Sequence, residues 1–308
     1  MSSFTSPVPV LIAGCGYIGE ALARQAMAAG HPVMGLCHRE ASAEALRKQG
    51  IAARAADLSS EESLTALARE WPGDTALVHC AASGRGGGVE AYRAVYQQGM
   101  ANLRRAFPGA RRVVFTSSTS VYPQIDGSWV TEESTAMPDR ETGRILRAVE
   151  EETIQGGGMV VRLAGLYGPG RSVLLKNFLS GNAVIDVRRE DPATPGGRWV
   201  NQIHRADAAR ALLFVLTTPR DMLPGSIFNA ADSTPMLQRT IYEELSRRFS
   251  LPLPPEAPPD ASRKRGWTHK RVDAARLRAA GWRPQFASWF EALDHDPDLL
   301  PSILALPD

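Results

Sequence analysis

Residues 8–19, with the sequence VPVLIAGCGYIG, constrain the fold more than any other part of the chain, because a short apolar run ends there in the pattern Gly-x-Gly-x-x-Gly. A helical pattern and a second apolar run follow, which is the order of a βαβ unit that binds a dinucleotide. In such a unit Gly14 permits the tight turn, Gly16 lets backbone N–H groups approach a diphosphate, and Gly19 lets the helix pack closely on the strand. The N-terminus of the helix adds unpaired N–H donors and partial positive charge. A glycine turn without a ligand is the alternative, and the place of the pattern after the first predicted strand favours nucleotide binding.

The composition, with 44% hydrophobic and 22% charged residues among 308, allows one large core or one core with a smaller lobe. No run approaches the roughly 18 apolar residues needed to cross a bilayer, and residues 1–9 carry neither a basic nor a continuous apolar stretch. A net charge of +2 gives no electrostatic reason to expect a nucleic acid or a membrane surface as partner. We therefore expect a cytoplasmic protein with a small-molecule substrate.

The three cysteines, Cys15, Cys37 and Cys80, lie at or beside the ends of predicted strands and lack Cys-x-x-Cys spacing. We expect them to be small buried thiols in a reducing compartment. The six histidines do not cluster with them, so no metal site is expected.

Apolar runs alternate with longer helical patterns through the first half of the chain, which predicts a parallel sheet with crossover helices. The predicted strands cover residues 9–13, 32–37, 51–55, 75–80, 112–116 and 159–163. The predicted helices between them cover residues 17–29, 41–49, 60–70, 89–106 and 139–154. This order favours an α/β fold with a doubly wound, Rossmann-like parallel sheet.

The second half is less regular and predicts a smaller, irregular C-terminal substrate lobe. Loops rich in Gly, Pro and Arg precede a predicted helix over residues 205–216 and a strand over 226–229, a proline-rich connection covers 251–259, and two short helices cover 272–280 and 286–293. We divide the chain into a dinucleotide-binding domain, 1–164 with 201–230 returning to it, and a substrate-binding lobe, 165–200 and 231–308.

Several further segments, taken in order, resemble the extended short-chain dehydrogenase/reductase superfamily, which includes NAD(P)-dependent nucleotide-sugar epimerases and dehydratases. They are residues 56–58 (ADL), 78–82 (VHCAA), 115–123 (FTSSTSVYP), 162–170 (RLAGLYGPG), 201–209 (NQIHRADAA) and 228–232 (FNAAD). The resemblance covers nearly the whole chain, and these segments fall at the carboxyl ends of the predicted strands, where an open α/β sheet binds its ligand.

The resemblance implies roles for individual residues. Asp57 and Leu58 would meet the adenine, Ala81 and Ala82 would line the nicotinamide ribose, and the loop 166–169, with Leu166, would border the nicotinamide. The glycine turn would contribute Gly14, Gly16, Tyr17, Ile18 and Gly19.

Ser118 falls at the catalytic serine or threonine of the superfamily. Its hydroxyl could hydrogen-bond a carbonyl or alcohol oxygen of the substrate. The alternative is a hydroxyl that satisfies backbone groups at a strand end.

The helix over residues 139–154 departs from the superfamily, whose members with ordinary chemistry carry Tyr-x-x-x-Lys there. Counting back from Glu150 in the usual spacing puts Thr142 at the tyrosine and Leu146 at the lysine, and no Tyr-x-x-x-Lys occurs elsewhere in the chain. The glycine turn is also one residue shorter than the usual GxxGxxG. Both departures resemble the atypical branch of the superfamily.

Two functions therefore remain open. The first is an NAD(P)-dependent oxidoreductase with an unconventional proton donor, for which Tyr122, Tyr167 and His204 are candidates, although aromatic residues at such positions more often serve packing. The second is a non-catalytic dinucleotide-binding protein that senses the redox state of the dinucleotide pool and passes it to a partner. Fold alone cannot separate them.

The second predicted strand ends in Cys37, followed by His38 and Arg39, where a preference for NAD would place an acidic residue. No carboxylate there repels a 2′-phosphate, and the planar guanidinium of Arg39 suits one. This favours NADP as cofactor, with NAD as the alternative if Arg39 points into solvent.

Five arginines lie in or next to the irregular segment that should cover the pocket: Arg171, Arg188, Arg189, Arg198 and Arg205. Such a group could bind a phosphate-bearing substrate, or could be solvated. The residues 270–273 (KRVD) are expected to cap and pack the last helical pair.

The resemblance implies that the helices predicted over residues 89–106 and 139–154 could form the seam of a homodimer, as such helix pairs commonly do in this superfamily. Val89, Tyr92, Val95 and Tyr96 form an apolar stripe on the first of them, which would belong either to a dimer seam or to the core against the sheet.

Overall fold

A seven-stranded parallel sheet forms the centre of the protein in the computed structural model, which describes residues 7–84, 87–187, 197–232, 234–259 and 268–306. The strands are β1 (Val10–Ala13), β2 (Val33–Cys37), β3 (Ala53–Ala55), β4 (Ala76–His79), β5 (Arg112–Ser118), β7 (Met159–Leu163) and β12 (Ile227–Ala230). Their order is β12-β7-β5-β4-β1-β2-β3, so the chain winds outward from β1 in one direction and, from β4 on, in the other. The predicted doubly wound fold is confirmed, with strand bounds that differ by at most two residues at either end.

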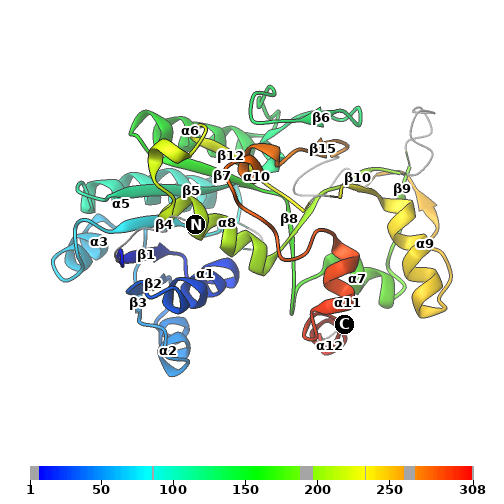
Figure 1. Ribbon diagram of the computed structural model, residues 1–308, viewed down its shortest axis with the longest axis horizontal. Coiled ribbons are helices and arrows are strands. Elements are labelled where there is room, and N and C mark those ends of the chain that lie inside the picture. Colours follow the sequence, from blue (N-terminus) through cyan, green and yellow to red (C-terminus); the bar gives the residue numbers. More distant parts are fainter. Residues whose placement is uncertain (1–6, 85–86, 188–196, 233, 260–267, 307–308) are drawn as a thin grey trace.

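Helices cover both faces of the sheet (Figure 1). On one face lie α1 (Tyr17–Ala28), α2 (Glu40–Lys48) and α8 (Arg205–Thr217), and on the other lie α3 (Glu61–Ala68), α4 (Val89–Tyr92), α5 (Gly99–Ala106) and α6 (Glu141–Gln155). The helix predicted over residues 89–106 is present, but its middle, η1 (Arg93–Gln98), is π-helical. The wider π turn changes which side chains of this segment face the sheet.

The C-terminal lobe lies to one side of the sheet and has its own apolar cluster (Figure 1). Its elements are α7 (Val173–Leu179), β9 (Ile185–Asp186), α9 (Gln238–Phe249), β14 (Glu256–Ala257), α11 (Trp289–His295) and α12 (Leu299–Leu304). Three of these helices, α7, α9 and α12, were not predicted from the sequence. The pattern of Ile241, Tyr242 and Leu245, which α9 buries in this cluster, was the available signal for the longest of them.

Short elements join the sheet and the lobe: η2 (Thr119–Val121), β6 (Trp129–Val130), β8 (Gly165–Tyr167), β10 (Trp199–Val200), β11 (Gln202–His204), η3 (Arg220–Met222), β13 (Met236–Leu237), β15 (Arg271–Val272) and α10 (Ala275–Ala279). The helix predicted to begin at residue 272 was placed too early, because Val272 pairs with Val130 in β6 and its N–H donates to Asn201 Oδ1 at 2.7 Å. Val272, Leu277 and Trp282 pack in the core of the sheet, although the sequence analysis assigned residues 231–308 to the smaller lobe.

Within the described residues, no helix is both long enough and apolar enough to cross a membrane.

Candidate functional site

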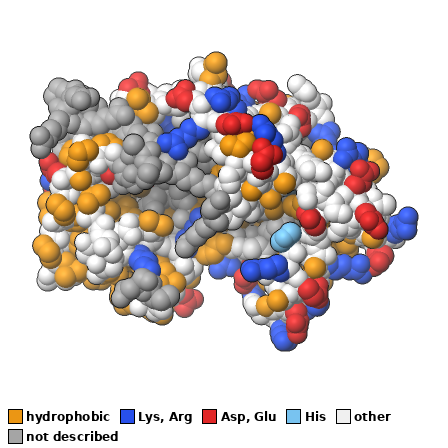
Figure 2. Space-filling model, turned by 180° about the vertical axis from the view of Figure 1, so that it is seen from behind, with side chains coloured by type: hydrophobic (Ala, Val, Ile, Leu, Met, Phe, Trp, Pro, Cys, Tyr) orange, Lys and Arg blue, Asp and Glu red, His pale blue; other side chains and the backbone are white. Residues whose placement is uncertain are grey.

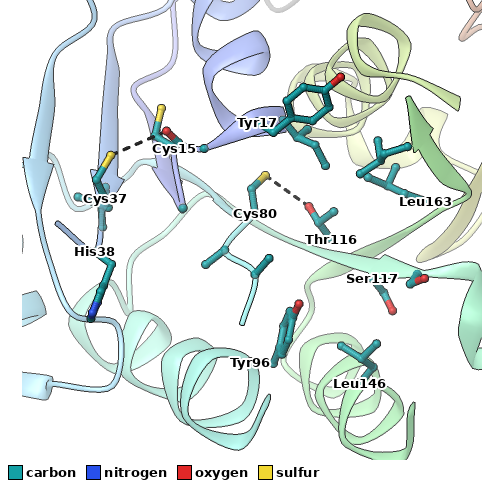
Figure 3. A pocket seen from close by; sticks show the side chains of 18 of the residues that line it. Cys15, Tyr17, Cys37, His38, Cys80, Tyr96, Thr116, Ser117, Leu146 and Leu163 are labelled. Carbon is teal, nitrogen blue, oxygen red and sulfur yellow. Dashed lines mark hydrogen bonds between the residues drawn. The ribbon is translucent and has the colours of Figure 1, made fainter. Parts of the chain in front are cut away.

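A cavity of about 460 Å³ opens at the carboxyl ends of β1 and β4, within the size range of small-molecule sites. The strand order reverses between these two strands, so their loops diverge to opposite sides and leave a crevice. Figure 3 shows side chains from the glycine turn, from the ends of β2, β4, β5 and β7, and from two helices around this space.

The glycine turn borders the cavity with a geometry that only glycine fits. Gly14 has φ +93° and its N–H donates to Leu36 O at 3.1 Å, and a Cβ on Gly14 would lie 2.2 Å from the backbone N of Ala81. A Cβ on Gly19 would lie 2.4 Å from Gly14 O, so α1 packs directly on the turn. Gly16 instead faces open space, and no side chain caps the N-terminus of α1. The first N–H groups of α1 are therefore accessible from the cavity.

The structure brings most of the predicted site residues together around the cavity. Those that line it are Gly14, Gly16, Tyr17, Ile18, His38, Arg39, Ala81, Ala82, Ser118 and Leu166. Gly19, Asp57 and Leu58 are not among the lining residues. The Asp57 carboxylate accepts hydrogen bonds from the N–H and hydroxyl of Ser59, and the Leu58 carbonyl accepts one from Asn102, so both residues close the turn after β3.

Tyr17 lines the cavity, and the guanidinium groups of two arginines lie over its ring. Its hydroxyl donates to Pro169 O at 3.2 Å, and the guanidinium groups of Arg171 and Arg205 lie 5.3 and 4.7 Å from its ring centroid. Burial raises the pKa of Tyr17 to about 12, and the two arginines oppose this rise only in part. The phenol is therefore neutral and acts as a packing element that joins the glycine turn to the loop after β8.

The five arginines proposed for phosphate binding differ in their surroundings. Arg171 lines the cavity, whereas Arg198 is paired with Asp186 at 3.1 Å and Arg205 with Glu20 at 3.5 Å. Arg188 and Arg189 lie outside the described residues.

Hydroxyl groups line the cavity where β5 ends. Thr116, Ser117, Ser118 and Ser120 all contribute to this wall. Ser118 is half-buried, and its Oγ accepts a hydrogen bond from Ser120 N at 3.2 Å, which leaves its own proton available for a ligand. Leu146 of α6 also lines the cavity, near Ser117 in Figure 3, so the position expected for a lysine carries an apolar side chain.

The three side chains expected as proton donors do not line the cavity. The Tyr122 hydroxyl donates to Asn229 Oδ1 and accepts from Arg162, both at 2.8 Å, in the core. Tyr167 is fully buried against His204 and Trp289, and burial raises the pKa of its phenol. His204 caps α8, with Nδ1 accepting from Ala206 N, while its Nε2 lies 3.0 Å from Asp296. In the structure, Tyr122 and Tyr167 are buried in the core and His204 caps α8.

Glu150 forms the centre of a buried polar network behind the hydroxyl wall. Its carboxylate is fully buried, accepts a 2.6 Å hydrogen bond from Ser117, and is paired with Arg162 at 2.7 Å and with Arg147. Arg162 is 1% exposed and extends the network to Tyr122. The network fixes β5, α6 and β7 relative to one another at the cavity edge.

Tyr92 and Tyr96 are among the cavity-lining residues that were not identified as site residues from the sequence. Of the predicted apolar stripe, Tyr92 and Tyr96 pack against the core, and Val89 and Val95 are not part of that cluster. His79, at the end of β4, is fully buried, and burial lowers its pKa, so its Nε2–H donates to Val95 O at 2.9 Å in the π-helical segment. Two tyrosines four residues apart in the helical segment that follows β4 were the available signal.

All three cysteines also line the cavity, and none forms a disulfide. Burial raises the pKa of Cys15 and of Cys80 to about 12, and burial also raises the pKa of Cys37. The thiols are therefore protonated at neutral pH and serve as small wall residues rather than nucleophiles.

Lys270 joins the C-terminal half to the turn that carries Ser118. It is 3% exposed, and its Nζ donates to Tyr122 O at 2.7 Å, at the end of η2. Residues 270–273 were expected to cap and pack the last helical pair, and Asp273 does cap α10 by accepting a hydrogen bond from Ala275 N at 2.7 Å. Lys270 instead reaches the turn after β5. Burial lowers its pKa from 10.5 to about 8.

We expect this buried lysine to make stability rise with pH. Between the folded pKa of about 8 and the unfolded pKa of 10.5, the unfolded chain holds a proton that the folded chain has released. The free energy of unfolding gains up to about 1.4 kcal/mol per pH unit from this group, whereas the buried thiols and phenols act in the opposite direction at higher pH. Urea unfolding of wild type and Lys270→Met from about pH 7 to about pH 9 isolates the contribution of the lysine. If the free energy of unfolding changes equally with pH in both proteins, burial does not disfavour the charged form of Lys270.

Comparisons with known proteins agree with this geometry. A sequence model of the NAD dependent epimerase/dehydratase family matches residues 10–231. Protein YeeZ of Escherichia coli K12 is 30% identical over 254 residues, which are 80% of this chain and 85% of that protein. The UDP-glucose 4-epimerase of Thermus thermophilus, solved in complex with NAD, aligns with 97% of this chain and 100% of its own at 20% identity and a TM-score of 0.79. The UDP-Glc/GlcNAc 4-epimerase of Campylobacter jejuni aligns with 91% of this chain and 95% of its own at 21% identity and a TM-score of 0.72, and at these identities the likeness concerns the fold.

Proposed function

Because the chain belongs to the NAD-dependent epimerase/dehydratase family, we propose that it is an NAD(P)-dependent oxidoreductase of the atypical extended short-chain dehydrogenase/reductase type. Its substrate would be a nucleotide sugar or another small carbonyl or alcohol compound. The observation that carries the proposal is the cavity at the strand-order reversal, which has an uncapped helix N-terminus at one end and the Ser118 hydroxyl at the other. A nicotinamide dinucleotide supplies hydride transfer at C4 of its ring.

The residues present fit such a dinucleotide. Gly16 leaves open space beside the first N–H groups of α1, which suits the diphosphate. Ala81 and Ala82 present small side chains at the end of β4, and Leu166 and Leu146 supply apolar walls for the nicotinamide end. In this arrangement the Ser118 hydroxyl would hold the substrate oxygen and the apolar walls would exclude water.

The substrate would be a small molecule, and Arg171 at the mouth could pair with its phosphate groups. On the face shown in Figure 2, the described Lys and Arg side chains are interspersed with Asp and Glu rather than gathered in one basic patch. This mixture favours a small ligand over a nucleic acid. The division into a dinucleotide-binding domain and a substrate lobe belongs to the same proposal.

The alternative is a dinucleotide sensor without turnover, and the observation that favours it is Leu146 on the cavity wall in place of a cation. Exchange of isotopically labelled hydride between NADP(H) and a panel of aldehydes, ketones and nucleotide sugars tests the two functions. Exchange with any member supports the enzyme. Tight dinucleotide binding without exchange across the panel supports the sensor.

We expect NADP(H) to bind more tightly than NAD(H), because Arg39 and His38 line the cavity at the end of β2 and no carboxylate does so there. Arg39→Ala should lower NADP(H) affinity by about tenfold or more, the effect of losing one charge-assisted pair of about 1.5–3 kcal/mol, and leave NAD(H) affinity unchanged. Isothermal titration calorimetry measures both.

Lys48→Ala is the matched control, since Lys48 ends the same helix α2, its side chain is 74% exposed and it does not line the cavity. Equal affinities of wild type for the two dinucleotides, or an Arg39→Ala variant that binds NADP(H) normally, would refute the preference.

Two further parts of the proposal concern assembly and location. The superfamily resemblance favours a homodimer built on the outer surfaces of α4, α5 and α6, which sedimentation velocity can test. The three free thiols suit a reducing compartment, so we place the protein in the cytoplasm.

A further inference from the structure

We propose that Tyr96 is the phenol that donates and accepts the proton at the substrate oxygen, an inference that rests on the oxidoreductase function proposed above. The cavity holds Ser118 to position that oxygen, but α6 presents Leu146 where a proton-transferring pair would be expected. Tyr122 and Tyr167 have their hydroxyls in the core. A phenol on the neighbouring helix would restore the missing function.

The Tyr96 ring is fixed against the sheet beside the hydroxyl wall. It makes an edge contact with Phe115 in β5, with ring centroids 6.2 Å apart, and a tilted contact with His79 in β4 at 5.8 Å. Phe115 directly precedes the cavity-lining residues Thr116, Ser117 and Ser118 along β5. The ring therefore lies where the strand delivers its hydroxyl groups.

The hydroxyl end of Tyr96 points away from its helix into the cavity. Figure 3 shows the side chain directed into the space between Thr116 and Leu146. The residue is half-buried and lines the cavity, so it is both desolvated on its ring faces and accessible to a ligand. A phenol and a serine hydroxyl that line the same cavity are a suitable pair for proton transfer to a carbonyl oxygen bound there.

The π-helical segment explains how Tyr96 comes to this position. A π turn holds about 4.4 residues instead of 3.6, so it rotates the side chains that follow, and such turns are rare and concentrate at functional sites. Here the Val95 carbonyl accepts from the His79 imidazole, so a fully buried side chain of β4 supports this segment one residue before Tyr96. The local distortion is thus anchored rather than frayed.

Tyr92 also lines the cavity but is a weaker candidate. It lies one turn earlier, and its ring contact is with Tyr96, at 4.9 Å, whereas Tyr96 contacts both β4 and β5. Tyr96 is therefore closer to the strand that carries Ser118, and Tyr92 supports its ring.

The proton balance of the step is simple. As the substrate carbonyl carbon is reduced by hydride transfer, the C=O double bond becomes a single bond and the oxygen takes the proton from Tyr96 Oη. The resulting phenolate recovers a proton from water. In the oxidative direction Tyr96 Oη accepts the alcohol proton.

The first test needs no turnover. Protein labelled with 3-fluorotyrosine carries a fluorine at each of its six tyrosines, and the resonances missing from Tyr96→Phe and Tyr242→Phe assign those two positions. Tyr242 lies in the separate lobe core, stacked on Phe178. Addition of NADP⁺ should shift the Tyr96 resonance and leave that of Tyr242 unchanged. A Tyr96 resonance that does not respond to saturating dinucleotide overturns the proposal and leaves the proposed function intact.

The second test is kinetic, with the substrate that the hydride-exchange panel identifies. Tyr96→Phe should lower kcat by about 10²- to 10⁴-fold, the usual contribution of a general acid, with the dissociation constant for NADP⁺ unchanged. Tyr242→Phe should retain wild-type kcat. A Tyr96→Phe variant with normal kcat overturns the proposal alone. Failure of the wild type to bind any dinucleotide or to turn over any panel member overturns both this proposal and the enzyme function.

Discussion

Glu150→Ala should lower the free energy of unfolding by about 3–5 kcal/mol, a large part of the roughly 5–15 kcal/mol available to a protein of this kind. The reason is the arginine left behind, because Arg162 is 1% exposed and its charge is paired with Glu150. Ser117 would also lose the acceptor of its 2.6 Å hydrogen bond. Equilibrium denaturation with urea measures the change.

Two comparisons separate the lost pair from a general effect of mutating α6. Glu151→Ala removes the adjacent carboxylate, which also pairs with Arg147 but is 58% exposed, and should cost no more than about 1 kcal/mol. The double variant Glu150→Leu with Arg162→Met removes both charges and should regain most of the stability lost in Glu150→Ala. A Glu150→Ala variant as stable as Glu151→Ala would mean that Arg162 finds water or another partner.

The sheet was predictable because most of its strands contain a short apolar run, and helical patterns lie between them. The glycine turn was predictable for a related reason. Gly14 and Gly19 are required by contacts of 2.2 and 2.4 Å that any Cβ would make, and such requirements leave a sequence signature. The short strands outside the sheet were less predictable, because β15, which contains Val272, pairs with β6 far away in the sequence.

Which tyrosines face the cavity could not be predicted, because side-chain direction there depends on partners far apart in sequence. Tyr122 turns into the core because Arg162 and Asn229 bind its hydroxyl. Tyr96 turns toward the cavity through a π-helical segment, which periodicity at 3.6 residues does not describe. Cavity residues fixed by backbone geometry were therefore predicted better than those fixed by side-chain networks.

Gly14→Ala should weaken dinucleotide binding by at least about tenfold and also destabilise the fold by about 1–3 kcal/mol or more. The new methyl group would lie 2.2 and 2.3 Å from the backbone N and Cα of Ala81, neither of which can move without displacing the end of β4. The residue would also have to adopt φ +93°, a conformation unfavourable for alanine. Because Gly14 and Ala81 both line the cavity, the displacement would alter the space that the diphosphate and ribose need.

Gly30→Ala provides the matched control. Gly30 follows the same helix α1 and has φ +85°, but no atom lies within 4 Å of the position that its Cβ would take. The Gly30→Ala variant has the unfavourable positive φ but no steric clash. It should lower the free energy of unfolding by about 1 kcal/mol and leave the affinity for the dinucleotide unchanged. Titration with NADP⁺ at a temperature where both variants remain folded separates the two effects. If Gly14→Ala binds as tightly as Gly30→Ala, the turn after β1 does not hold the dinucleotide, and the helix N-terminus beside it has another purpose.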